Sequence, residues 1–427
     1  MPGIELLRSF HHEQVPSQPQ TRMKIAILSR NPELYSTHRL VEAAQKKGHE
    51  VRVYNPKLFA MGVSTSPTLH YRGEQFQGAD AVIPRIGASI TFYGVALVRQ
   101  LEQMGIFCAN ESQAIARSRD KLRCLQVLSR HKINMPPTEF VRAKKDILPA
   151  IERLGGAPVI LKVLEGTQGI GVILADTAKV AEAVIEAFQS AKQNLLIQKF
   201  VKESKGTDIR AFVVGNRVVA AMRRSASAPD EFRSNVHLGA TVTKLDLSRE
   251  YQETAIKAAQ IVGLNIAGVD MLETTQGPAI MEVNSSPGLE GIEEASGVDV
   301  AGEIIGFLEE RARFPEVRLE QMLRFKSGYA VVSAQVSPDS PIAGKTLRQS
   351  DLTNRDIFVL GIERGSLRFN FPHADSRVEV GDTLVIYGKL ALLRELLPAT
   401  GEEKEKKAGG KRKKADETVE LPADCST

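Results

Sequence analysis

The sequence contains no tryptophan, and phenylalanine, tyrosine and tryptophan together make up only 5% of its residues. Proteins that bind single-stranded nucleic acids usually stack bases on aromatic side chains, and this chain has few to offer. Its net charge of +5 is small for 427 residues and does not by itself indicate a nucleic-acid surface, although it is compatible with an acidic substrate. We therefore expect no direct nucleic-acid partner.

Cysteine is much scarcer still, with three residues in the whole sequence. Cys108, Cys124 and Cys425 form no CxxC pair and are odd in number, so neither a disulfide framework nor a zinc site is indicated. No apolar run approaches the length of a membrane span, and the first 21 residues are polar where a signal peptide would have an apolar centre. These absences predict a cytoplasmic protein that has no membrane partner.

The composition, with 42% hydrophobic and 25% charged residues, is typical of a globular protein of two or three domains. A buried-strand pattern begins at Met23, which is also a candidate translation start. Strands at 24–29, 51–54 and 79–84 alternate with helices at 37–47 and 91–104. This alternation predicts a doubly wound α/β domain.

Beyond this domain the periodicity predicts one long helix at 112–130 and further helices at 178–190, 249–262 and 300–311, mixed with antiparallel strands. A β-rich module follows, with strands at 329–336, 357–363, 367–371 and 383–387, and then a tail that mixes both charges. The expected divisions are a disordered extension (1–22), the α/β domain (23–112), a central domain (113–313), a linker (314–327), the β-rich module (328–397) and a disordered charged tail (398–427).

Two apolar runs, 267–272 and 279–283, flank turn residues at 276–278 and predict neighbouring strands that bring Asp270, Glu282 and Asn284 together. Glu282 and Asn284 are two residues apart, so they share a strand face. Two carboxylates about 4 Å apart repel by roughly 4 kcal/mol at an effective dielectric constant of 20, so a cation is needed to offset them. Oxygen ligands of this kind suit Mg²⁺. The alternative is that the carboxylates are surface charges and that Asn284 caps a turn.

A second pattern places Lys162 in an apolar strand directly before a glycine-rich loop that includes Gly169 and Gly171. Glycine allows the backbone to approach an anion closely, so N–H groups of this loop are candidates to bind phosphate, with Lys162 supplying a compact positive charge. The loop is not a Walker motif, because no Gly-Lys-Ser/Thr ends it. An ordinary hairpin with a flexible tip is the alternative interpretation.

Several motifs, taken together and in this order, resemble the ATP-grasp carboxylate–amine ligases. The most similar subgroup is the RimK type, whose members add glutamate to the C-terminus of small-subunit ribosomal protein six. The resemblance runs from Met23 to about Arg311. It rests on Lys24–Arg30, Ile83–Gly87, Ile90–Gly94, Arg119–Lys121, the Lys162 strand and its loop, Gln198–Val201, Asp208–Gly215, Phe232–Asn235, Asp270 and Glu282–Ile292. It implies an α/β and α+β protein: an ATP-grasp fold between a doubly wound α/β domain and a small β-rich α+β domain.

The resemblance also implies roles for single residues. In the family pattern Lys121 and Lys162 bind ATP phosphates, and Asp208 lies on the ribose or adenine side. Arg233, Ser234 and Asn235 match a loop that contacts the nucleotide and the reacting carboxylate. The ligands of Mg²⁺ or Mn²⁺, with two ions expected, match Asp270, Glu282 and Asn284.

The hinge that holds adenine matches Lys199 and Phe200, and here the chain departs from the family. Position 199 is Lys where the family usually has Glu. The change is tolerable if the hinge contacts adenine through its backbone, and it alters nucleotide affinity if the usual Glu contacts the ribose.

The activity implied is an ATP-dependent ligation through an acyl phosphate, with ATP as co-substrate, L-glutamate as the incoming amine, and Arg233, Lys162 and Arg210 as catalytic residues. Such chemistry needs alignment and charge neutralisation more than a protein nucleophile. Both substrates are anionic, which makes Arg85, Arg210, Arg223 and Arg224 candidate carboxylate ligands. For Arg223 and Arg224, solvated loop charges are the alternative.

The β-rich module resembles the TrkA-C domain of potassium-uptake regulators, which implies a small-molecule effector. The resemblance rests on Ser340–Leu347, Ile357–Arg364 and Val380–Gly388. Other outcomes stay open: synthesis of poly-α-glutamate, ligation to a small carboxylated metabolite, or a nucleotide-responsive regulatory protein. A homo-oligomer is expected from the family.

Overall fold

The computed structural model describes residues 22–164, 171–228, 231–233, 239–313, 329–365, 367–370 and 372–393. These residues fall into two compact units, one that ends before the segment 314–328 and one that follows it. Each unit is described by itself.

The first unit begins with a parallel sheet whose strand order is β2 (Glu50–Tyr54), β1 (Lys24–Leu28), β6 (Ala81–Pro84) and β7 (Phe107–Cys108). Alternate residues of β1 pack on opposite faces. Ile25 and Ile27 belong to the core that includes α1 (Tyr35–Lys46), whereas Ala26 and Leu28 belong to the core that includes α2 (Thr91–Gln103). The predicted doubly wound α/β arrangement is therefore confirmed.

An antiparallel meander lies between β2 and β6, and it was not predicted. It follows a 3₁₀ turn, η1 (Pro56–Leu58), and consists of β3 (Phe59–Gly62), β4 (Thr68–Tyr71) and β5 (Glu74–Gln75). Its strands are held by an aromatic cluster in which the rings of Tyr54, Phe59, Tyr71 and Phe76 lie 5.0–5.7 Å apart. A second 3₁₀ turn, η2 (Ala88–Ile90), precedes α2.

The single long helix predicted at 112–130 is wrong, because the chain breaks it into α3 (Ser112–Arg119) and α4 (Lys121–Arg130). Asp120 between them is extended, with φ −87° and ψ 98°, and its side chain accepts a hydrogen bond of 3.0 Å from the backbone N–H of Arg123. Aspartate is a strong N-cap, so it begins a new helix rather than continuing the old one. The break leaves Arg119 and Lys121 on either side of a corner.

A four-stranded sheet follows, with strand order β10 (Val172–Ala175), β9 (Val159–Val163), β11 (Leu195–Lys199) and β8 (Thr138–Glu139). Two helices, α5 (Ile147–Arg153) and α6 (Ala178–Ser190), pack on it around a core of aliphatic side chains. Short 3₁₀ turns, η3 (Lys144–Asp146) and η4 (Lys202–Ser204), precede α5 and follow β11.

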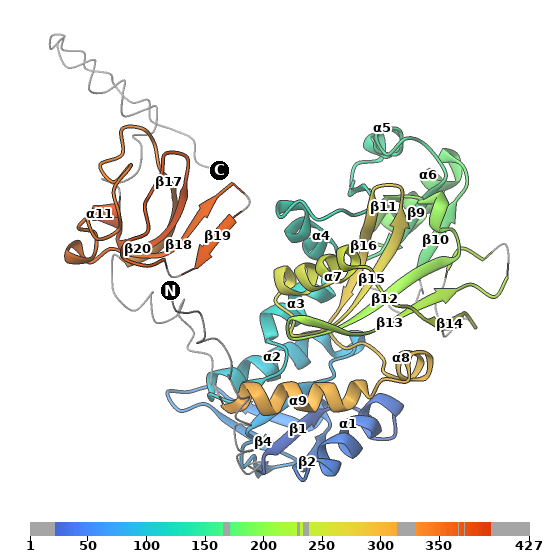
Figure 1. The fold of residues 1–427 in the computed structure, drawn as a ribbon. Coiled ribbons are helices and arrows are strands. Elements are labelled where there is room, and N and C mark those ends of the chain that lie inside the picture. Colours follow the sequence, from blue (N-terminus) through green and yellow to red (C-terminus); the bar gives the residue numbers. More distant parts are fainter. Residues whose placement is uncertain are drawn as a thin grey trace, which may run out of the picture. The chain divides into compact units, whose positions relative to one another are not determined.

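A five-stranded antiparallel sheet forms the centre of the first unit (Figure 1). Its strand order is β14 (Thr241–Lys244), β13 (Arg217–Ser225), β12 (Thr207–Val214), β15 (Ile266–Thr274) and β16 (Gly277–Asn284). One face packs against α7 (Arg249–Val262). On the other face, Phe212, Val214 and Ile266 join a core shared with the N-terminal sheet.

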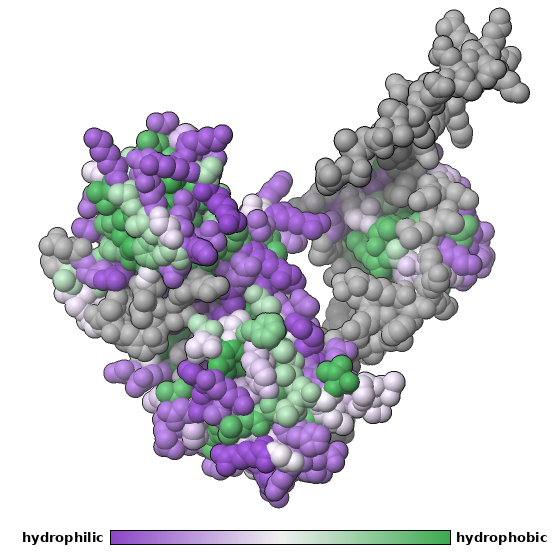
Figure 2. All heavy atoms as spheres, turned by 180° about the vertical axis from the view of Figure 1, so that it is seen from behind, coloured by the Kyte–Doolittle hydropathy of each residue, from purple (hydrophilic) through white to green (hydrophobic). Residues whose placement is uncertain are grey.

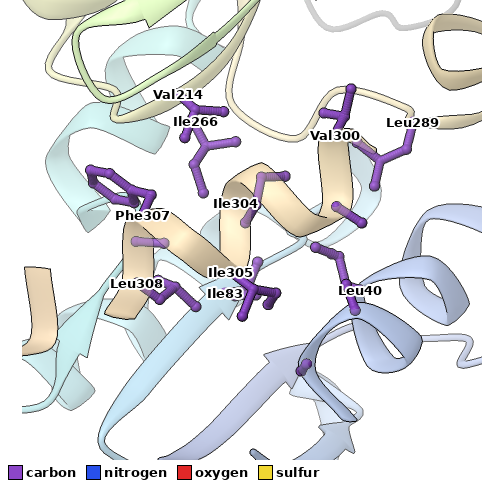
Figure 3. Close-up of a cluster of buried hydrophobic side chains, with 14 of the residues drawn as sticks. Leu40, Ile83, Val214, Ile266, Leu289, Val300, Ile304, Ile305, Phe307 and Leu308 are labelled. Carbon is purple, nitrogen blue, oxygen red and sulfur yellow. The ribbon is translucent and has the colours of Figure 1, made fainter. Parts of the chain in front are cut away.

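Two late helices connect the central sheet to the N-terminal domain. They are α8 (Glu290–Ser296) and α9 (Val300–Arg313). Figure 3 shows side chains of α9, among them Ile304, Ile305 and Leu308, lying between the central sheet and Ile83 of the N-terminal sheet. Arg39 of α1 adds ion pairs of 3.0 Å to Glu293 and 2.9 Å to Asp299.

The second unit is a small antiparallel sheet with strand order β17 (Tyr329–Gln335), β20 (Thr383–Lys389), β18 (Phe358–Arg364) and β19 (Leu367–Asn370). A 3₁₀ turn, η6 (Thr353–Arg355), and a short helix, α11 (Leu390–Leu393), accompany it. Leu352, Ile357, Ile362, Leu384 and Ile386 lie in its core. All four predicted strands are present, with ends shifted by one or two residues.

Within the described residues, no helix combines the length and the apolar character that crossing a bilayer requires. Figure 2 shows hydrophilic and hydrophobic residues interspersed over one face of the described surface.

Candidate active site

A pocket lies in the first unit where the four-stranded sheet, the central sheet and α4 meet. Its walls combine two kinds of side chain. The charged residues among them are Lys121, Lys162, Lys199, Asp208, Arg224, Arg233, Asp270 and Glu282. The apolar residues include Cys124, Leu125, Leu128, Ile160, Val172, Leu196, Phe200, Val201, Leu272 and Met281. The pocket therefore offers both charged groups, which suit an anion or a cation, and apolar surface, which suits a flat apolar group.

A row of five charged side chains, four of which line the pocket, is built by cross-strand register in the central sheet. Asp208 of β12 is opposite Arg224 of β13, Arg210 of β12 is opposite Asp270 of β15, and Asp270 is opposite Glu282 of β16. Directly opposite residues of an antiparallel pair share one face, so all five side chains project from the same side of the sheet. The predicted pairing of the strands that carry Asp270 and Glu282 is confirmed.

Asp270 is the centre of this row. Arg210 donates two hydrogen bonds of 2.6 Å to it, one to each carboxylate oxygen, and an Nη atom of Arg224 lies 3.1 Å from Oδ2. The Asn284 amide is 3.4 Å from the same Oδ2 atom. Burial opposes the charge, but the two guanidinium groups outweigh it and hold the pKa of Asp270 below its ordinary value. Asp270 is therefore ionised and buried.

Arg224 bridges two carboxylates. Its Nε donates a hydrogen bond of 2.5 Å to Asp208, and both side chains are only 4% exposed. Burial disfavours the charge of Arg224, but the carboxylates of Asp270 and Asp208 raise its pKa. The interpretation of Arg224 as a solvated loop charge is wrong, because alternation on β13 turns it toward the pocket.

Arg223, the residue before Arg224, lies on the opposite face of β13 and pairs with Glu273. Its side chain is 32% exposed, and it belongs to a strand rather than to a loop. Strand alternation thus separates two arginines that look equivalent in the sequence.

Two lysines approach Glu282 from other elements. Lys162 of β9 and Lys121, the first residue of α4, both line the pocket, and the carboxylate of Glu282 favours the charged form of each. Burial is the larger effect: it lowers the pKa of Lys162 to about 8 and also lowers the pKa of Lys121. Lys121 Nζ donates hydrogen bonds of 3.2 and 3.1 Å to the carbonyl groups of Val163 and Leu164.

Lys199 and Phe200 lie at the edge of the pocket where β11 ends. The Lys199 side chain is exposed, and its backbone N–H donates a hydrogen bond of 2.9 Å to Pro137. This N–H is therefore already committed within the protein.

Arg233 also lines the pocket, where Glu231 holds it. Two hydrogen bonds, of 2.9 and 2.8 Å, join the guanidinium to the Glu231 carboxylate, and the group lies 5.6 Å from the ring of Phe232. Three predicted site residues, Gly169, Ser234 and Asn235, lie outside the described residues.

Gly171, at the end of the glycine-rich segment, has φ +81°. A side chain there would be strained, and its Cβ would lie 2.8 Å from a methyl group of Val163. Glycine is thus required by local geometry at this position.

The sequence analysis missed the wall formed by α3 and α4, which contributes Ser118, Cys124, Leu125 and Leu128. The apolar periodicity of 121–130 predicted a helix but did not indicate what its apolar side would face. Burial raises the pKa of the Cys124 thiol to about 12, so this cysteine lines the pocket without being a nucleophile.

The oxygen atoms at this place fit a hard divalent cation. In the described ranges no cluster of three or more His, Cys, Asp or Glu side chains has metal-binding geometry, so a cation here would have two carboxylates and the Asn284 amide. Mg²⁺ accepts so few protein ligands because it keeps waters and takes phosphate oxygens. Glu282 forms no hydrogen bond or ion pair with the described residues, whereas Asp270 would have to loosen its contact with Arg210.

Comparison with known families gives three matches along the chain. Residues 23–115 match the RimK PreATP-grasp domain, residues 118–308 match the RimK-like ATP-grasp domain, and residues 331–401 match the TrkA-C domain.

Two curated relatives show how much of the chain is shared. The chain is 55% identical over 377 residues, 88% of its length, to a probable alpha-L-glutamate ligase of Rhodopirellula baltica, of which it covers 93%. It is 57% identical over 292 residues, 68% of its length, to probable alpha-L-glutamate ligase 1 of Hahella chejuensis, of which it covers 96%. The second relative is thus matched almost completely by about two thirds of this chain.

Solved structures share the fold. A RimK domain ATP-grasp protein of Sphaerobacter thermophilus is 24% identical with a TM-score of 0.51, over 67% of this chain and 99% of that one. The ATP-grasp ligase PsnB, in complex with a minimal precursor, is 19% identical with a TM-score of 0.54, over 67% of this chain and 98% of that one.

Proposed function

Because the chain belongs to the RimK-type ATP-grasp ligases, which are ATP-dependent enzymes, we propose that it joins L-glutamate to the C-terminal carboxylate of small-subunit ribosomal protein six through an acyl phosphate. The observation that supports this most strongly is the pocket in which the paired carboxylates Asp270 and Glu282 face Lys121 and Lys162. This arrangement can hold a divalent cation and the phosphates of a nucleotide side by side.

The two lysines bind the phosphate groups in this proposal. A phosphate oxygen offers Lys162 the counter-charge that burial denies it, so nucleotide binding raises the pKa of Lys162 from about 8 and secures its proton. Lys121 is fixed by two backbone carbonyl groups and adds a second positive charge from another element. Together they hold a triphosphate in position for in-line transfer.

Asp270, Glu282 and Asn284 would hold Mg²⁺ or Mn²⁺, and two ions are part of the proposal. The cation would neutralise charge that develops on the transferred phosphate. The protein contributes the fixed row of charges. Arg224 forms ion pairs with both Asp208 and Asp270, and these ion pairs hold the Asp270 carboxylate in place.

The reaction then proceeds in two transfers. A carboxylate oxygen of the acceptor attacks the γ-phosphorus of ATP, the bond to the β-phosphate oxygen breaks, and ADP leaves. The amine of glutamate next attacks the acyl carbon, loses a proton and expels inorganic phosphate, which leaves an amide bond. Arg210 and Arg233, each paired with a carboxylate of the protein, are positioned to exchange that partner for a phosphate or carboxylate oxygen.

Adenine would pack against apolar residues of the pocket, beside Phe200 and the α4 wall. The ribose would lie toward Asp208, and the exposed Lys199 side chain would leave adenine recognition to the backbone of the hinge. The second unit, which matches the TrkA-C domain, would bind a small-molecule effector and support a homo-oligomer.

The test is glutamate-dependent ADP release by the purified full-length protein with Mg²⁺, ATP and an acceptor peptide that carries the C-terminal sequence of the ribosomal protein. Mass spectrometry of the peptide reads the number of glutamyl units added. Free glutamate and small carboxylated metabolites serve as competing acceptors in parallel reactions.

Addition of glutamate to the peptide in preference to the other acceptors supports the proposal. If free glutamate grows into chains, or only a metabolite is modified, the proposed acceptor is wrong and the ligase chemistry is supported. ATP binding without ADP release under all these conditions would favour a regulatory protein.

A further inference from the structure

Two arginines beside the pocket have no carboxylate partner among the described residues. Arg85 follows the last residue of β6, and Arg119 ends α3. Within the part of the chain that the structure describes, each donates a hydrogen bond only to a backbone carbonyl group: Arg85 to Pro287 at 2.6 Å, and Arg119 to Ile86. Other arginines of the site, Arg210, Arg224 and Arg233, all pair with a carboxylate of the protein.

The two guanidinium groups are close enough to repel. Burial is the main cause that lowers the pKa of Arg85 to about 10, and the charge of Arg119 adds to the effect. Burial also lowers the pKa of Arg119, against a favourable contribution from Glu282. Two neighbouring, partly buried cations without an anion are unfavourable, so a protein retains them where a ligand supplies the missing charge.

One atom shows that the site is incomplete. The Nε of Arg119 is buried and has no hydrogen-bond partner among the residues that the structure describes. Leaving a buried donor unsatisfied is unfavourable. An acceptor oxygen from a bound ligand would satisfy it.

The pair lies next to the proposed reaction centre. Pro287, whose carbonyl group Arg85 binds, follows Asn284 by three residues. Gly268, directly opposite Asn284, sits between Pro287 and Arg210: a Cβ there would lie 2.8 Å from Pro287 Cβ and 3.6 Å from Arg210 Nε. Glu282, which acts on Arg119 at longer range, is committed to the cation in the proposed function. Glu282 then no longer balances the positive charges of Arg85 and Arg119.

We propose that Arg85 and Arg119 form the subsite that binds the side-chain carboxylate of the incoming amino acid and so select a dicarboxylic amino acid as the amine donor. This inference rests on the proposed function. A partly buried subsite suits a small molecule that can be enclosed, whereas a protein tail must enter and leave. A neutral side chain would leave these two cations unpaired, and such sites reject the uncharged analogue strongly.

The experiment compares glutamate with glutamine as the amine donor in full-length protein, by ADP release at saturating Mg²⁺, ATP and acceptor peptide. Wild type is expected to prefer glutamate. Arg119→Ala should raise KM for glutamate at least about 10-fold, leave KM for ATP unchanged, and reduce the glutamate-to-glutamine preference in kcat/KM by about 10-fold or more. Arg85→Ala should do the same. Arg123→Ala, which removes an exposed arginine three residues after Asp120, is the control and should change neither value.

A merely structural role gives a different result. If Arg119→Ala lowers kcat/KM for glutamate and glutamine equally, or raises KM for the acceptor peptide instead, the inference is wrong. Should an alanine variant fail to fold, Arg119→Lys and Arg85→Lys keep the charge without the fork geometry, and their preference must still fall. Absence of glutamate-dependent ADP release in wild type would overturn the proposed function, whereas a preference that survives in the variants would overturn this inference alone.

Discussion

The two faces of the central sheet use the same strands for opposite purposes. On the face toward α7, Ile209, Ala211, Val269, Met271 and Ile280 pack into a continuous apolar core. On the other face, the intervening positions of these strands carry Asp208, Arg210, Arg224, Asp270 and Glu282. Neighbouring residues of each strand point to opposite faces, so one face packs the core and the other carries the charged groups.

The difference matters because buried charges are poor stabilisers. Desolvation costs several kcal/mol for each buried ion. A protein with apolar residues of similar volume in place of a buried ion pair is often at least as stable. A row of four or five charges on one face, with apolar packing available on the other, is therefore best explained by what the row binds. The apolar face stabilises the sheet, whereas the charged face is available to bind a ligand.

The largest expected effect is on stability, from the charged face itself. Arg224→Met should destabilise the protein by about 3–5 kcal/mol, because it leaves Asp208 and Asp270 buried with one cation fewer. Denaturant unfolding of the first unit measures this. A loss below about 1 kcal/mol would mean that the row is not a coupled network, and the contrast between the faces would fail.

The next effect separates catalysis from stability. Glu282→Gln should lower kcat/KM for ADP release by about 10²–10³-fold, because a carboxylate facing the phosphates is lost. The melting temperature should change little, since Glu282 has no hydrogen bond or ion pair among the described residues. Glu253→Gln, on the exposed surface of α7, is the matched control and should retain full activity. Comparable losses in both variants would contradict the assignment.

A pH titration probes Lys162, which belongs to β9 of the four-stranded sheet and lines the same pocket as the charged face. The pKa of Lys162 is about 8 in the folded protein against an ordinary value of 10.5, so the buried charge costs stability at neutral pH and the cost is relieved as pH rises from about 8 to 10.5. Nucleotide binding has the opposite trend, because it needs the protonated lysine. The Kd for ATP should rise by up to about tenfold per pH unit above pH 8.

Calorimetric titrations of ATP at several pH values measure this trend. Lys162→Arg should remove it, since arginine stays charged throughout the range. An unchanged pH profile in Lys162→Arg would show that another group titrates.

The smallest effect comes from the apolar face. Ile280→Val should cost about 0.5–1.5 kcal/mol of stability, the usual penalty for deleting one buried methylene group. Its kcat and KM values should equal those of wild type at a temperature where both are folded. A specific loss of activity would show that the two faces are not independent.

The sequence predicted features that depend on residues close together in the chain. Two apolar runs around a turn were enough to place Asp270 opposite Glu282, because a hairpin pairs neighbouring strands in register. The helix break at Asp120 was missed because the apolar periodicity continues across it, although aspartate followed by a helical run is an N-cap signal. The meander at 59–75 was missed because its strands are only two to four residues long.

Long-range partners could not be predicted. Nothing in the run Arg223-Arg224 tells which arginine is buried, since that depends on the register of β13 with β12. The closeness of Arg85 and Arg119 depends on the end of α3 packing beside the end of β6, where Arg119 donates a hydrogen bond to the carbonyl group of Ile86. The apolar wall of α4 likewise became part of the pocket only through tertiary packing.

The most direct test of the charged face is a crystal structure of the protein with Mn²⁺ and a non-hydrolysable ATP analogue, with the metal located by its anomalous scattering. We predict a manganese peak bound by the carboxylates of Asp270 and Glu282 and the amide oxygen of Asn284, with phosphates near Lys121 and Lys162. Metal and triphosphate bound elsewhere, with the contacts of Asp270 to Arg210 and Arg224 unchanged, would contradict the account.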